Sequence, residues 1–160
     1  MIRAVVTWGY IGTLPRAPGT WGSAAAIPCA WVLHWAGGFW ALALATLAAF
    51  ALGLWATEQY LAGRRDDPSE VVIDEVVGMW ITLWPLSWGL SQAGTDPHIF
   101  PWPGWVIGFL LFRFFDIVKP PPIRWCDRPG AFWVMLDDVA AGAVSAVLVF
   151  TAAWVAHGGI

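Results

Sequence analysis

The sequence predicts an all-helical protein that crosses a membrane several times. Its 160 residues are 59% hydrophobic and only 12% charged, whereas a soluble domain usually carries about 25% charged residues. Charge-free runs of 41, 20, 16 and 22 residues cover positions 17–57, 76–95, 97–112 and 139–160. A helix needs about 20 mostly apolar residues to cross the hydrocarbon core of a bilayer. Fourteen tryptophans support the same interpretation, because indole rings favour the bilayer interface.

These runs predict four to five membrane helices in a single domain, residues 1–160. Gly37-Gly38 offers a turn that divides the longest run into two helices. Pro85 is expected to kink or shorten the third helix. The first helix is only about 24 Å long at 1.5 Å per residue, which is short enough for a re-entrant or tilted segment. The expected helices cover residues 21–36, 39–57, 76–90, 103–118 and 139–156.

Gly104 and Gly108 form a GxxxG motif on the fourth predicted helix. Such a pair can let the backbone of another helix approach closely. Glycine without a packing role is an equally good interpretation of this motif.

The basic residues predict the topology. Two precede the first helix, two follow the second, and four lie at the end of the fourth helix or just after it. With five spans, every basic residue falls on one side, which the positive-inside rule makes cytoplasmic. We therefore expect the charged motifs at the cytoplasmic face of the membrane, with the C-terminus outside. A net charge of −3 gives no basic surface for nucleic acid. The basic residues are Arg3, Arg16, Arg64, Arg65, Arg113, Lys119, Arg124 and Arg128.

The first polar segment, residues 12–23, is rich in glycine, proline and hydroxyl side chains and leads into a helix. Free backbone N–H groups at a helix N-terminus favour a phosphate. This makes Gly19, Thr20, Gly22 and Ser23 candidate phosphate contacts. Taken alone, the segment is better explained as a turn that caps the helix through Thr20 or Ser23.

Seven of the eleven acidic residues lie in three further segments, residues 67–78, 112–120 and 134–142. Two acidic pairs, Asp74-Glu75 and Asp137-Asp138, stand directly before predicted helices, where acids also stabilise the helix dipole. In the third segment, Asp116 can pair with Arg113 or Lys119 at helical spacing.

Apolar flanks favour a functional role for these acids over a purely structural one. Val-Val-Ile precedes Asp74 and Val-Met-Leu precedes Asp137, and ionised groups at such depth are costly and usually functional. Five carboxylates brought together need a cation, and all-oxygen ligands favour Mg²⁺. The expected metal ligands are Asp74, Glu75, Asp137 and Asp138.

The basic residues near the acids complete the predicted chemistry. Arg113 and Lys119 are natural partners for a phosphate. Asp116 and Lys119 join the acidic pairs as candidate catalytic residues. These residues predict a Mg²⁺-dependent enzyme that acts on a phosphorylated lipid, with water attacking phosphorus as the default reaction.

The four segments, in this order, resemble the phosphatidylglycerophosphatase A family of bacterial lipid phosphatases. The matching blocks cover residues 12–23, 67–78, 112–120 and 135–142. The resemblance implies an all-helical inner-membrane enzyme that hydrolyses phosphatidylglycerophosphate, with Mg²⁺, to phosphatidylglycerol and phosphate. It leaves the oligomeric state and the direct metal ligands open. One departure stands out: the family's glycine-rich run before the Asp-Asp pair is reduced here to Gly130, followed by Ala131-Phe132-Trp133.

Two other classes remain as alternatives. A small transporter or channel can also carry carboxylates at membrane depth, although it usually places them in mid-helix. A CDP-alcohol phosphatidyltransferase also uses Mg²⁺ and aspartates, but it needs a longer run of spaced aspartates than this sequence contains.

Overall fold

The computed structural model describes residues 1–62, 69–121, 123–126 and 128–156, and every regular element within these ranges is helical. The all-helical prediction is therefore confirmed. Asp67 of the second polar segment lies outside the described residues, as do Arg64 and Arg65, two of the basic residues that predict the topology. The elements are α1 (Ile2–Val6), η1 (Ile11–Thr13), α2 (Pro18–Leu61), α3 (Ile73–Gln92), α4 (Trp102–Val118), η2 (Ile123–Trp125) and α5 (Ala131–Ala156).

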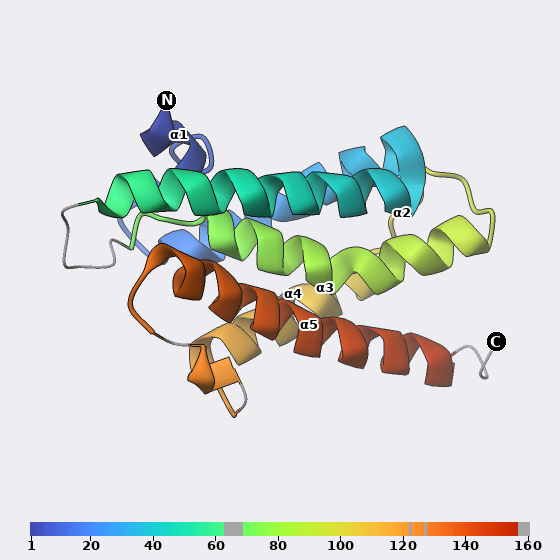
Figure 1. Ribbon diagram of the computed structural model, residues 1–160. Helices are drawn as coiled ribbons and strands as arrows, with labels where there is room; N and C mark the ends of the chain where they lie inside the picture. Colours follow the sequence, from blue (N-terminus) through green and yellow to red (C-terminus); the bar gives the residue numbers. More distant parts are fainter. Residues whose placement is uncertain (63–68, 122, 127, 157–160) are drawn as a thin grey trace.

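The long helix α2 consists of two arms that meet at the glycine pair Gly37-Gly38. Gly37 is extended, and Gly38 has a φ of +62°, a conformation that disfavours residues with a Cβ. After this break the second arm runs back toward the end at which the first arm begins (Figure 1). The predicted break in the 41-residue run is confirmed.

Helix α3 is the buried centre of the bundle, and it packs against both α2 and α5 (Figure 1). Val76, Val77 and Leu83 are completely buried. Two indole N–H groups of α3 also bond to α2. Trp80 donates to the carbonyl of Ala26 at 2.9 Å, and Trp84 donates to the hydroxyl of Thr46 at 3.2 Å. These contacts fix α3 against both arms of α2.

Helices α2 and α5 are each long and apolar enough to cross a membrane, and most of their surface faces outward. Large apolar side chains cover that surface. Trp40 and Leu44 of α2 are 67% and 64% exposed, and Val147 and Val155 of α5 are 64% and 74% exposed. Extended apolar surfaces of this kind mark contact with a membrane or a partner. Together with their length, they indicate membrane association.

The predicted starts of two helices were wrong. Helix α5 begins at Ala131 instead of Val139, and α3 begins at Ile73 instead of Val76. The acidic pairs therefore lie within helices, and Asp137-Asp138 lie in the second turn of α5. A charge-free run marks the part of a helix in which ionised side chains are excluded. The hydrogen bonds of the helix do not depend on side-chain charge, so the helix can begin before that run. The starts of α3 and α5 nevertheless share one end of the bundle, opposite the C-terminal end of α5 (Figure 1).

Candidate active site

A cavity of about 420 Å³ opens at the end of the bundle where α3 and α5 begin and α4 ends. Five carboxylates and three cationic side chains line it, and they come from parts of the chain that are far apart in sequence. Its charged lining residues are Asp74, Glu75, Arg113, Asp116, Lys119, Arg128, Asp137 and Asp138. All six predicted catalytic residues are among them.

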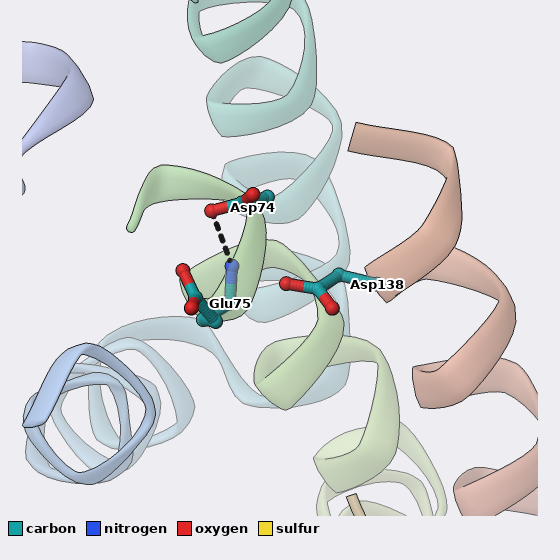
Figure 2. A group of neighbouring side chains, drawn as sticks. All are labelled: Asp74, Glu75 and Asp138. Atoms are coloured by element: carbon teal, nitrogen blue, oxygen red, sulfur yellow. Dashed lines mark hydrogen bonds between the residues drawn. The ribbon is translucent and has the colours of Figure 1, made fainter. Parts of the chain in front are cut away.

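The first turn of α3 supplies Asp74 and Glu75. Asp74 is buried, and its Oδ1 accepts a hydrogen bond from the backbone N–H of Glu75 at 3.0 Å (Figure 2). Oε2 of Glu75 is also buried and accepts no hydrogen bond from the described residues. A buried carboxylate oxygen without a donor is unfavourable unless another ligand meets it. This oxygen could be a ligand of a cation in the cavity.

Helix α5 supplies Asp137 and Asp138, which are 7% and 4% exposed. The carboxylate of Asp138 points toward α3, and its oxygen lies within 4.8 Å of oxygens of Asp74 and Glu75 (Figure 2). Asp138 also forms a second group of the same kind with Asp116 and Asp137. Asp138 is thus shared between two adjacent groups of three carboxylates.

Two glycines allow α3 and α5 to come close enough for this arrangement. Gly78 lies one turn after Asp74, and Gly142 lies one turn after Asp138. A Cβ on Gly78 would lie 2.6 Å from the carbonyl oxygen of Asp138, and one on Gly142 would lie 3.0 Å from Cα of Gly78. The predicted GxxxG pair has a different role. Gly104 and Gly108 face the side chains of Leu86 and Thr82 on α3.

Two cations of the cavity are held by its acids. The guanidinium of Arg113 donates to Asp116 at 2.6 Å, and the ammonium of Lys119 pairs with Asp137. Lys119 ends α4 with a φ of +46°, in the left-handed conformation. The second carboxylate group therefore has cationic partners within the protein. No such pair is recorded for Glu75 and Asp138 among the described residues.

The glycine-rich segment meets the cavity at one of the four predicted positions. Gly19 lines the cavity, where a Cβ would collide with the Glu75 carboxylate. Gly22 packs closely against Val72 instead, and Thr20 is not a lining residue. Ser23 donates to the carbonyl of Gly19 at 2.8 Å and accepts a hydrogen bond from Arg113 at 3.4 Å. A phosphate contact through the backbone of these residues stays a prediction.

Glu70 of the second polar segment lies outside the cavity lining. It pairs with Arg3 at 3.0 Å and accepts a hydrogen bond from Tyr60, so it ties α1 and the end of α2 to the segment before α3. The hydrogen bond and the charge of Glu70 raise the pKa of Arg3. This acid has a structural role.

The sequence interpretation missed two side chains of the cavity, Arg128 and Trp133. The Arg128 guanidinium lies over the Trp133 ring, 4.6 Å from its centroid. Trp133 precedes Asp137 by four residues on α5, so both belong to one helical face. The predicted helix began at residue 139, so Trp133 and Asp137 were not recognised as neighbours on one helical face. A helix predicted to begin before Trp133 would have shown it.

The donor set fits Mg²⁺. Asp74, Glu75 and Asp138 offer carboxylate oxygens within 4.8 Å of one another, without histidine or cysteine. Magnesium is bound in proteins through a few carboxylates, together with waters and substrate phosphates. The adjoining Arg113 and Lys119 would meet such a phosphate.

The chain is similar to known proteins over most of its length. A family model described as phosphatidylglycerophosphatase A matches residues 4–153. The phosphatidylglycerophosphatase A of Escherichia coli is 34% identical over 143 residues, covering 87% of this chain and 76% of the relative. That of Haemophilus influenzae is 34% identical over 142 residues, covering 87% and 80%. A Bacteroides thetaiotaomicron protein, named "Putative phosphatidylinositol-3-phosphatase", is 40% identical over 151 residues, covering 90% and 88%. No solved structure matches the chain.

Proposed function

The chain belongs to the phosphatidylglycerophosphatase A family, and we propose that it hydrolyses phosphatidylglycerophosphate to phosphatidylglycerol and inorganic phosphate with Mg²⁺. Membership in the family makes it a phosphatase that acts on a membrane lipid. One observation carries the proposal: the Asp74, Glu75 and Asp138 carboxylates converge in a cavity that also contains Arg113 and Lys119. This combines a site for a hard divalent cation with donors for a phosphate.

Asp74, Glu75 and Asp138 are the proposed ligands of the metal. Asp137 was predicted to be a fourth, but its ion pair with Lys119 favours a different role. When bound, Mg²⁺ supplies Lewis-acid stabilisation of the charge that develops on the phosphoryl group. Asp137 and Asp116 hold Lys119 and Arg113 in place, and this fixed arrangement lowers the cost of orienting the two cations when the phosphate arrives.

The terminal phosphate of the lipid binds to Arg113 and Lys119. The planar guanidinium can grip two phosphate oxygens, and the ammonium adds a point charge beside them. Asp116 accepts the proton of the attacking water, whose oxygen forms the new bond to phosphorus. The ester bond between phosphorus and the glycerol oxygen breaks, and that oxygen leaves with a proton from solvent.

The same site is proposed to face the cytoplasm of a bacterial inner membrane. The two arms of α2, together with α3, α4 and α5, would form five spans, with the C-terminus outside. The positive-inside rule supports this orientation, since the basic residues lie near those helix ends that are at the same end of the bundle as the cavity.

A phosphoinositide is the second candidate substrate. The Bacteroides relative, with its printed phosphatidylinositol-3-phosphatase name, is 40% identical over 90% of this chain. Both candidate lipids carry a phosphomonoester on a headgroup that a phosphodiester joins to diacylglycerol. The described site chemistry suits either lipid.

Phosphate release by the purified protein in detergent tests the proposal. Phosphatidylglycerophosphate should be hydrolysed with Mg²⁺, should not be hydrolysed after stripping with EDTA, and should be hydrolysed again when Mg²⁺ is restored. Asp138→Asn is the matched inactive control. Faster release from phosphatidylinositol 3-phosphate would select the second candidate. Full activity in EDTA would exclude the metal assignment.

A further inference from the structure

Arg128 differs from the other cations of the cavity in its partner. Arg113 and Lys119 pair with carboxylates. In the part of the chain that the structure describes, Arg128 instead contacts the Trp133 ring. The guanidinium lies over the indole ring, and such a group carries five N–H donors in its own plane. The ring contact therefore orients Arg128, and no hydrogen bond or ion pair joins its guanidinium to another of the described residues.

The Arg128–Trp133 pair lies in the outer part of the cavity. Arg128 is exposed and Trp133 half-buried, whereas Asp137 and Asp138 are buried. Trp133 precedes Asp137 by one helical turn, about 6 Å along the axis of α5. The ring that contacts Arg128 thus projects from α5 one turn before the carboxylate that pairs with Lys119.

The local chain geometry holds this pair in place. Gly130 has a φ of +119°, which a side chain disfavours, and it turns the chain between Arg128 and the start of α5. Trp133 lies in the first turn of α5, three residues after Gly130. Indole rings favour the headgroup level of a bilayer, where the phosphodiester of a lipid also lies.

We propose that Arg128, oriented by Trp133, binds the phosphodiester of the lipid headgroup while the inner cations bind the terminal phosphate. The inference rests on the proposed function, because it assigns the second phosphate of the same substrate. It makes Arg128 a specificity-determining residue that favours lipids with both phosphates over phosphatidic acid, which has only a phosphomonoester. Trp133 is a positioning residue that acts through Arg128.

The test compares kcat/KM for phosphatidylglycerophosphate and phosphatidic acid in wild type and Arg128→Ala. A charge-assisted hydrogen bond of the usual strength corresponds to roughly a tenfold to hundredfold effect. The ratio of the two kcat/KM values should fall by about that factor, mainly through a higher KM for phosphatidylglycerophosphate. Trp133→Ala should lower the ratio less. Arg124→Ala is the matched control, because Arg124 is exposed in η2 and outside the cavity lining.

Inhibition provides a second measurement that does not need phosphatidic acid to be a substrate. Phosphatidylglycerol keeps only the phosphodiester, so Arg128→Ala should weaken its inhibition about tenfold or more. Inhibition by inorganic phosphate should weaken in Lys119→Ala far more than in Arg128→Ala. An Arg128→Ala variant that matches Arg124→Ala in both measurements would overturn the inference. Failure of the wild-type protein to hydrolyse phosphatidylglycerophosphate would instead overturn the proposed function.

Discussion

Replacing Gly78 by alanine tests whether the close approach of α3 and α5 creates the site. Gly78 faces the backbone of Asp138, and Gly142 faces Gly78 in return. No charged group is altered by this change. Any effect on catalysis must therefore pass through a displacement of α5 or of Phe112 on α4, whose Cε2 atom would lie 2.5 Å from the new Cβ.

The magnitude follows from the contact. The new Cβ would lie 2.6 Å from the carbonyl oxygen of Asp138, whereas ordinary contacts begin near 3.4 Å. The helices must therefore separate locally by about 0.8 Å, the difference between these distances. Misplacement of about 1 Å can cost about 100-fold in rate. Overpacking costs about 1–3 kcal/mol of stability, against about 1 kcal/mol gained from the helix propensity of alanine.

Phosphate release and thermal unfolding followed by circular dichroism should be measured together. Gly78→Ala should lose roughly 100-fold in kcat/KM at a temperature where it remains folded, and higher Mg²⁺ should restore part of the loss because the carboxylates have moved apart. Gly89→Ala is the matched control, since Gly89 lies on the same helix with open space around it. This control should keep its activity and melt slightly higher.

One result would refute the reasoning. If folded Gly78→Ala kept its activity within about twofold of wild type, close helix packing would not control the carboxylate geometry, since a 1 Å displacement is expected to matter far more. Asp138 would then tolerate displacement relative to Asp74 and Glu75.

Three further outcomes are expected. Glu75→Gln should lower turnover by roughly 100- to 1,000-fold in a phosphate-release assay. Glu58→Gln, on the exposed surface of α2, should stay near wild type. Equal losses in the two variants would show that the active site has been assigned to the wrong residues. Lys119→Ala should raise KM or lower kcat/KM far more than it lowers the melting temperature, and a lower melting temperature with normal kinetics would leave only a structural ion pair. In a variant without native cysteines, Arg124→Cys should react with a membrane-impermeant thiol reagent only from the cytoplasmic side, and Ala93→Cys only from outside; the reverse pattern would overturn the topology.

The sequence by itself determined the helical class, the break in the long apolar run and most of the charged residues that line the cavity. Each of these depends on the charge or the backbone preference of single residues, which are the same in any tertiary structure. A charge-free run can lie in the hydrocarbon core because it has no ionised side chain that would have to leave water. Gly37-Gly38 can turn because glycine tolerates the left-handed conformation. The acids and bases were identifiable because only 12% of the residues are charged and long runs between them carry no charge.

Only the tertiary structure decided how those charged residues divide their roles. Asp137 and Asp138 are neighbours in sequence, yet one pairs with Lys119 and the other approaches Asp74 and Glu75. Adjacent helical residues point about 100° apart, so their partners depend on the rotation and separation of the surrounding helices. The contact between Gly78 and Gly142 sets that separation, and the true start of α5 places Trp133 on the face of Asp137. These are relations between distant segments, and the charge pattern along one chain does not encode interhelical distances.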